Sequence, residues 1–140
     1  MESVIMPREG IGPVRIGMSK DAVKRVLGEP TSRFMQGPFA EAETESFHPR
    51  GIQVDYDKNG MVNFISATSA ARPTFQGRPV VGMPFEECKA WFKQFDISLE
   101  TDATGFSSSK LGISVFASGA MKEPSDPVEA VSIFTQGYYD

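Results

Sequence analysis

Apolar residues recur at helical spacing in two segments of the chain, 19–27 and 84–92. Ser19 stands in front of the first segment as an N-cap, and Gly28 follows it. Pro84 occupies the start of the second segment. The apolar positions are Ala22, Val23, Val26 and Leu27 in the first, and Phe85, Cys88, Trp91 and Phe92 in the second. The spacing therefore predicts two helices, each with one buried face.

Short extended segments with alternating polarity follow each predicted helix. After the first helix they are 32–35, 44–48, 51–57 and 61–67, and after the second they are 97–101, 104–110, 112–118 and 128–136. Asn59-Gly60 between two of them is a strong hairpin signal. The pattern predicts an antiparallel meander after each helix.

Two phrases recur in the same order in both halves. Ile16-Gly17-Met18 and Val81-Gly82-Met83 precede the helices, and Gly51-Ile52-Gln53-Val54 corresponds to Gly112-Ile113-Ser114-Val115. We therefore expect an α+β fold in which two tandem helix-plus-antiparallel-sheet repeats form one broad sheet with the helices on one face. Residues 1–140 form a single domain with half-repeats of about 1–70 and 75–140, and Ala70–Gln76 is expected to be the linker between them.

Strand alternation assigns side chains to the two faces of this sheet. With Ile52, Val54 and Tyr56 turned towards the helices, the opposite face carries Asp55, Asp57, Phe116 and Phe134. Aromatic side chains ringed by polar groups are common in protein interfaces, so these four are predicted partner-binding residues. A register shift of one residue would instead place both phenylalanines in the core, and the sequence leaves that alternative open.

Composition favours a cytoplasmic protein with an acidic surface. The 140 residues are 40% hydrophobic and 23% charged, which is enough for one core. The net charge of −4 and the lack of a basic patch argue against nucleic acid and favour a cationic partner. We expect no membrane association, because neither a secretory signal nor a run of about 18 apolar residues occurs. The lone Cys88 predicts a buried structural thiol in a reducing compartment.

Two further segments are candidate contact sites. Glu41, Glu43 and Glu45 alternate along an extended segment, which favours a solvated loop, a contact with a cationic partner or a divalent-metal site. Tyr138 and Tyr139 near the C-terminus are either a frayed end or a contact tail. All five are included among the predicted partner-binding residues.

Signals for catalysis are missing from the sequence. His48, the single histidine, precedes Pro49 and is predicted to lie in a surface turn. The sequence has no second histidine, and only a distant cysteine, to complete a set of metal ligands with it. No nucleophile elbow, phosphate loop or dinucleotide fingerprint occurs. We therefore expect a non-enzymatic protein with no cofactor and no metal.

Four stretches of the first half carry a family resemblance. They are residues 14–23, Leu27-Gly28-Glu29-Pro30, Val54-Asp55-Tyr56-Asp57 and Gly60-Met61-Val62. They resemble the repeat of outer-membrane assembly lipoproteins of the BamE (SmpA/OmlA) family and of the tandem-repeat β-lactamase inhibitor proteins. The resemblance implies a helical hairpin or helix packed on an antiparallel sheet, duplicated to give a concave sheet that grips another protein.

A small acidic cytoplasmic protein on that scaffold is similar to immunity proteins of contact-dependent inhibition and polymorphic toxin systems. That similarity implies stoichiometric covering of a toxin's active site or a neighbouring surface, the toxin being cationic and in many systems a nuclease. A non-catalytic adaptor of the BamE type and a small-ligand-binding domain are the alternatives. A homodimer through an exposed strand edge also stays open.

Overall fold

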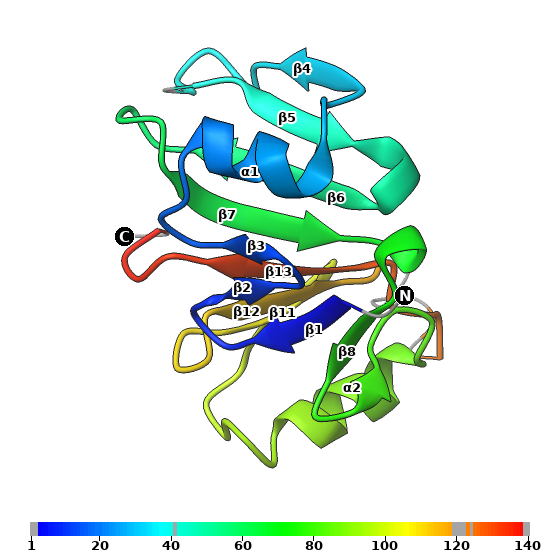
Figure 1. Cartoon of the computed structure of the whole chain (residues 1–140). Helices are drawn as coiled ribbons and strands as arrows, with labels where there is room; N and C mark the ends of the chain where they lie inside the picture. The colour runs from blue at the N-terminus through cyan, green and yellow to red at the C-terminus, as the bar shows by residue number, and fades with distance from the viewer. Residues whose placement is uncertain (1–2, 41, 119–122, 124, 139–140) are drawn as a thin grey trace.

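Two antiparallel meanders of four strands each form most of the structure. This computed structural model describes residues 3–40, 42–118, 123 and 125–138. The strands are β4 (Ser32–Phe34), β5 (Thr44–Phe47), β6 (Ile52–Tyr56) and β7 (Val62–Ala67), then β10 (Glu100–Asp102), β11 (Gly105–Ser108), β12 (Ile113–Phe116) and β13 (Ala130–Phe134). Antiparallel pairing of β7 with β13 joins the meanders into one eight-stranded sheet of order β10-β11-β12-β13-β7-β6-β5-β4 (Figure 1).

Both predicted helices are present. In α1 (Lys20–Leu27), the Ser19 hydroxyl accepts the Ala22 N–H at 3.2 Å, and the chain leaves the helix at Gly28 with a φ of 84°. The second helix, α2 (Phe85–Phe92), begins after Pro84 without a side-chain cap and buries its four predicted apolar residues. The family resemblance implied either a helical hairpin or a single helix in each half, and the structure has a single helix in each.

A second, five-stranded sheet was not predicted from the sequence. Its strands are β1 (Ser3–Met6), β2 (Gly10–Ile11), β3 (Val14–Arg15), β8 (Pro73–Phe75) and β9 (Arg78–Pro79), in the order β3-β2-β1-β8-β9. The central pair, β1 and β8, is parallel and the other pairs are antiparallel. The fold is therefore α+β with two sheets.

The expected linker Ala70–Gln76 is in fact largely core structure. It contains part of the 3₁₀ helix η2 (Ser69–Ala71) and all of β8, and Phe75 is buried. The Phe75 ring stacks on the Phe92 ring of α2 with centroids 5.1 Å apart and an interplanar angle of 12°. The prediction of a linker is wrong because Arg72-Pro73 directs the chain into a short strand instead of into solvent.

Equivalent backbone hydrogen bonds fix the start of each helix to its own meander. The N–H of Gly17 donates to the Val62 carbonyl, and the Val62 N–H donates to the Met18 carbonyl. Gly82 and Met83 make the same pair of bonds with Val128. Gly17 and Gly82 have φ values of 90° and 94°, a conformation that glycine adopts without strain. The shared phrase thus sets the entry angle of each helix.

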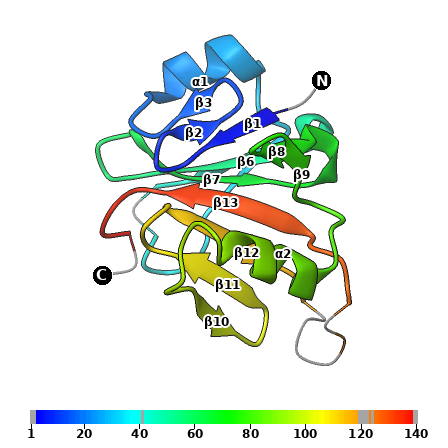
Figure 2. The same cartoon turned by 90° about the horizontal axis from the view of Figure 1, so that it is seen from below.

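Both helices contribute to a single hydrophobic core. Val23 of α1 and Phe92 of α2 belong to the same cluster of buried residues as Ile65 of β7 and Ile133 of β13. Figures 1 and 2 show α1, α2 and the five-stranded sheet on the same side of the large sheet. Within the described residues, no helix is long and apolar enough to cross a membrane.

Candidate protein-binding surface

The large sheet has a second face, turned away from the helices, which we call the open face. Strand pairing assigns its side chains, because paired residues share a face and residues alternate along each strand. Its members, strand by strand from β4 to β10, are Ser32, Phe34, Thr44, Ser46, Gln53, Asp55, Phe64, Ser66, Ala130, Ser132, Phe134, Ser114, Phe116, Gly105, Ser107, Glu100 and Asp102. In the part of the chain that the structure describes, no helix packs on this face.

The predicted face assignment is confirmed for Asp55 and Phe116. Phe116 pairs with Ala130 and leaves 43% of its surface exposed. Asp55 pairs with Phe64 on the open face, where its Oδ1 atom accepts the Thr44 hydroxyl at 2.6 Å. The register was therefore right, and these two residues are accessible contact candidates.

Phe134 faces the open side as predicted, but only 5% of its surface is exposed. The Tyr138 ring covers it with centroids 6.3 Å apart, and the same ring packs on Phe64 at 5.1 Å. The expectation that Phe134 is an exposed contact is wrong because the chain turns back over the sheet after β13. Tyr138 is half-buried in this packing, so it does not belong to a frayed end.

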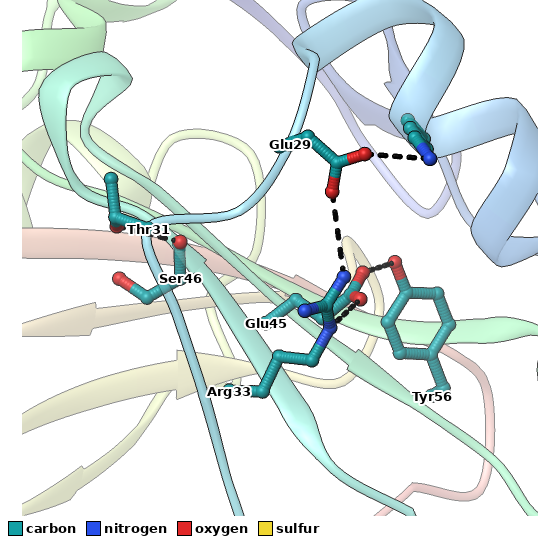
Figure 3. A network of polar contacts seen from close by, with 7 residues as sticks. Glu29, Thr31, Arg33, Glu45, Ser46 and Tyr56 are labelled. Carbon is teal, nitrogen blue, oxygen red and sulfur yellow. Dashed lines mark hydrogen bonds and ion pairs between the residues drawn. The ribbon is translucent and has the colours of Figure 1, made fainter.

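Glu45 is buried, contrary to the prediction of an exposed acidic cluster. It pairs with Val54 and faces the helix side, with 6% of its surface exposed. Its carboxylate accepts the Tyr56 hydroxyl at 2.6 Å and the Arg33 Nε–H at 3.0 Å (Figure 3). Burial and the Glu45 carboxylate together raise the pKa of Tyr56 above its usual range, so this tyrosine stays protonated as a donor. Glu45 therefore holds the structure together and is not a contact residue.

The Glu45 network continues to the surface. The Arg33 guanidinium also lies 3.6 Å from Glu29, and Glu29 lies 2.6 Å from the ammonium of Lys24 on α1 (Figure 3). These contacts link edge strand β4 to the end of α1. The hydrogen bond to Glu45 raises the pKa of Arg33, while the bond from Lys24 lowers the pKa of Glu29.

Two further predicted contact residues that the structure describes, Asp57 and Glu43, lie outside the strands of the open face. Asp57 lies beyond the end of β6, where its carboxylate accepts the N–H groups of Asn59 and Met61 and closes the hairpin turn. The prediction that Asp57 lies on the open face is wrong, because the strand pairing shifts between Asp55 and Tyr56 and β6 ends before Asp57. Glu43 is exposed and precedes β5. Glu41 and Tyr139 lie outside the described residues.

Carboxylates are the only charged groups among the strand residues of the open face. They are Asp55 on β6 and Glu100 and Asp102 on β10. None of these described strand positions is a lysine or an arginine. The charge that the strand residues contribute to this face is therefore negative, which favours a cationic partner.

Two hollows flank the aromatic cluster formed by Phe64, Phe134 and Tyr138. One of about 530 Å³ is lined by Phe116, Phe134, Ser107, Ser114 and the carboxylates Glu100 and Asp102, among others. The other, of about 420 Å³, lies between the β4–β5 loop and the C-terminal turn, with Asp55, Phe39 and Tyr138 in its lining. Each hollow combines an aromatic wall with a carboxylate.

Phe39 is the clearest contact candidate that the sequence analysis missed. It lies in the β4–β5 loop, 94% of its surface is exposed, and it borders the second hollow. Phe34 and Met35, close by in the chain, are exposed as well. The sequence signal for its exposure was Gly37-Pro38, a turn dipeptide directly before Phe39. A phenylalanine next to such a turn lies outside any strand or helix that would place its side chain in the core.

The described residues contain no cluster of three or more histidine, cysteine, aspartate or glutamate side chains that could hold a metal ion, and the thiol of Cys88 is buried. Cys88 is buried on α2, and this burial raises its pKa to about 12, so the thiol stays protonated at neutral pH. His48 is exposed in the 3₁₀ helix η1 (His48–Arg50), as the sequence predicted.

Comparison of the chain with protein-family models, curated proteins and solved structures found no match in any of the three.

Proposed function

We propose that this protein is a bacterial immunity protein that binds a cationic toxin through the open face and neutralises it by covering its active site or a neighbouring surface. The observation that carries the proposal is the face itself: it is broad, holds exposed aromatic side chains, and has carboxylates as its only charged strand residues. Such charge complementarity speeds encounter and selects the partner. The binding would take place in the cytoplasm, without a cofactor or metal.

We also infer that the chain is a tandem repeat built for binding. The support is the equivalent role of Gly17 and Gly82, each followed by a methionine that completes the same pair of bonds to a strand valine. Joining two equivalent meanders through β7 and β13 doubles the area of the open face. A broad face of this kind suits contact with another protein better than enclosure of a small molecule.

The first test is co-expression with the product of the neighbouring gene in the genome of origin. If the proposal is right, that product alone stops growth, co-expression restores it, and the two proteins purify as a stoichiometric complex. A neighbour that is harmless and forms no complex would contradict the immunity role and favour a BamE-type adaptor. Turnover of a substrate by the isolated protein would contradict both.

A charge-reversal pair then tests the open face. Glu100→Lys places a cation among the open-face carboxylates, at an exposed side chain that makes no hydrogen bond or ion pair within the described residues, and we expect it to weaken the complex by more than about 1 kcal/mol. Glu86→Lys is the matched control, because it makes the same charge change at an exposed position of α2 on the other side of the sheet. Isothermal titration calorimetry measures both. Equal losses in the two variants would mean that net charge matters and the open face does not.

A further inference from the structure

One of the two hollows on the open face combines groups that together suit a single kind of ligand. It has a volume of about 530 Å³ and is lined from β10, β11 and β12, at one edge of the eight-stranded sheet. Its lining includes two carboxylates, Glu100 and Asp102, and the ring of Phe116, which is 43% exposed. Ser107 and Ser114 belong to the same lining. The hollow thus offers negative charge, hydroxyls and an aromatic wall in one place.

Strand pairing places Asp102 and Phe116 on opposite sides of a gap. Asp102 pairs with Gly105, and Gly105 pairs with Phe116, so the three residues form one row across β10, β11 and β12. Neighbouring strands lie about 4.8 Å apart, which puts the backbones at Asp102 and Phe116 about 9.6 Å apart. The middle position has no side chain. A Cβ on Gly105 would collide with the Val115 carbonyl oxygen, so glycine is needed there and the gap stays open.

The width of this gap matches a cation bound to both of its sides. A charge-assisted N–H···O bond is about 2.8 Å long. A cation is attracted to an aromatic ring when it lies within about 6 Å of the ring centroid. Together these distances span about 9 Å, close to the separation of Asp102 and Phe116. A cation above Gly105 can therefore contact the carboxylate and the ring at the same time.

Contacts within the β10–β11 turn hold the Asp102 carboxylate in position. Its Oδ1 atom accepts the Thr104 N–H at 2.8 Å and the Thr104 hydroxyl at 3.1 Å. Within the described residues its Oδ2 atom accepts no hydrogen bond. One oxygen therefore fixes the side chain and the other is left for a ligand. Such preorganisation reduces the entropy that is lost on binding.

Further acceptors lie beside the gap. Glu100, Ser107 and Ser114 form the next row on this face, two residues along the strands and about 6.6 Å away. Among the residues that the structure describes, these three side chains make no hydrogen bond or ion pair. A carboxylate and two hydroxyls are therefore available to the same ligand.

This arrangement favours a guanidinium over an ammonium. A guanidinium carries five N–H donors in a planar fork. It can donate to Asp102 and to the neighbouring row together while its plane stacks on the Phe116 ring. An ammonium is a compact, strongly hydrated charge with three donors and no plane to stack. The spread of the acceptors and the aromatic wall therefore select arginine over lysine.

We propose that this hollow binds an arginine side chain of the protein partner, with the guanidinium between Asp102 and Phe116. Glu100 and the hydroxyls of Ser107 and Ser114 accept its remaining N–H groups. Arginine is enriched among the residues that dominate the binding energy of protein interfaces. The inference rests on the proposed use of the open face for a cationic protein, and it names the side chain that anchors that partner. It does not require that the partner be a toxin.

The test uses the full ¹⁵N-labelled chain and pentapeptides with capped ends, so it is independent of any toxin. The probe is the peptide Gly-Ala-Arg-Ala-Gly. Two matched peptides carry lysine or citrulline in place of arginine, and citrulline has nearly the shape of arginine without its charge. Chemical shifts of the backbone amides report both the affinity and the place of binding.

We expect saturable shifts at β10, β11 and β12 with the arginine peptide. Binding should be about threefold weaker for the lysine peptide and about tenfold weaker for the citrulline peptide. Equal binding of the citrulline peptide would overturn the role of charge, and equal binding of the lysine peptide would overturn the preference for arginine. Shifts centred on the hollow near Asp55, or no saturable shift, would overturn the site itself.

Two conservative substitutions test the two sides of the gap. Asp102→Asn removes the charge and keeps an oxygen that accepts the Thr104 bonds, while Phe116→Leu removes the ring and keeps an apolar side chain. We expect each to weaken binding of the arginine peptide about fivefold. The matched controls are Asp21→Asn, at an exposed position of α1, and Phe39→Leu, in the other hollow. Neither control should change the affinity.

The amide spectrum shows whether each variant is folded. Undiminished binding by folded Asp102→Asn and Phe116→Leu would refute the site. If Phe116→Leu does not fold, Glu100→Gln tests the same hollow through an exposed carboxylate, with a loss of about threefold expected. Arginine binding here together with a harmless neighbouring gene product would contradict the immunity role and leave this inference standing. A toxin complex without arginine binding would do the reverse.

Discussion

At the residue scale, most polar side chains with short contacts stabilise the fold, and few are left to bind a partner. Glu45 and Asp57 are engaged by neighbouring donors, and so is Asp96. Asp55 retains one unengaged carboxylate oxygen within the described residues, since only its Oδ1 accepts a hydrogen bond. Contacts within the chain therefore separate structural carboxylates from those open to a partner.

Removal of the Tyr56 hydroxyl tests the Glu45 network. Tyr56→Phe leaves a buried carboxylate with one donor fewer, and we expect a loss of about 1.5–3 kcal/mol in the free energy of unfolding. Urea denaturation followed by circular dichroism measures it. Lys24→Ala breaks an exposed ion pair of the same network and should leave the midpoint unchanged. An unchanged midpoint in Tyr56→Phe would show that Arg33 alone satisfies Glu45.

Asp96 should make stability depend on pH in the acid range. Its carboxylate accepts the hydroxyl of buried Ser108 at 2.6 Å and the Ser98 N–H at 2.9 Å, which lowers its pKa below the usual 3.8. The unfolded chain therefore binds this proton more readily. The stabilisation is complete above the ordinary pKa and is lost as the pH falls through the lower folded value.

The measurement is the urea midpoint between pH 2 and pH 7 for the natural protein and for Asp96→Asn. We expect the natural protein to lose stability below about pH 4 and the variant to show a shallower loss there. Parallel profiles would assign the acid sensitivity to other carboxylates.

At the element scale, the two helices begin in different ways despite equivalent positions in the fold. Ser19 caps α1 with its hydroxyl, whereas Pro84 precedes α2 and has no side chain that can accept a hydrogen bond. The burial of the helices differs too, because α1 buries Val23 and Leu27 while α2 buries four apolar residues. We therefore expect α1 to depend more on its cap than α2 does on its start.

Replacement of the α1 cap measures this dependence. Ser19→Ala should cost about 1 kcal/mol, because the Ala22 N–H loses its acceptor. Ser19→Asp is the matched control, since a carboxylate can accept the same bond and also favours the helix N-terminus. Thermal unfolding compares the two. Equal stabilities would mean that the backbone bonds at Gly17 and Met18 alone fix the helix start.

At the scale of the whole molecule, the pairing of β7 with β13 makes the two halves depend on one core. Ile65 and Ile133 are paired across this junction and are fully buried. Trp91, the single tryptophan, belongs to the same cluster through α2. A destabilising substitution in the first meander should therefore also lower the stability of the second half.

Ile65→Ala tests this coupling. The cavity should cost about 2–5 kcal/mol, and the transition seen by Trp91 fluorescence should shift together with that seen by far-ultraviolet circular dichroism. Val26→Ala, at a partly exposed position of α1, is the control with a small expected effect. A Trp91 transition that stays in place while the circular dichroism transition shifts would show two independently folding halves.

Local patterns in the sequence were enough to predict the helices, most strands and the face of the sheet towards which the side chains of a strand point, because each depends on spacing within one segment. Ser19 and Gly28 bounded α1, and alternation placed Ile52 and Val54 inward and Phe116 outward. The predictions that were wrong concern residues whose environment depends on contacts between distant segments. Phe134 is covered by the turn that carries Tyr138, Glu45 is paired with Tyr56 from the next strand, and Phe75 packs on α2.

The sequence by itself determined that the chain has two helices, each followed by an antiparallel meander, since hydrophobic period and turn residues are local properties. Only the tertiary structure decided how the meanders join and which carboxylates remain exposed. It also brought Asp102, Gly105 and Phe116 into one row, with the gap between the carboxylate and the ring left open. The reason is that register between strands is a relation among distant segments, set by the packing of the whole core.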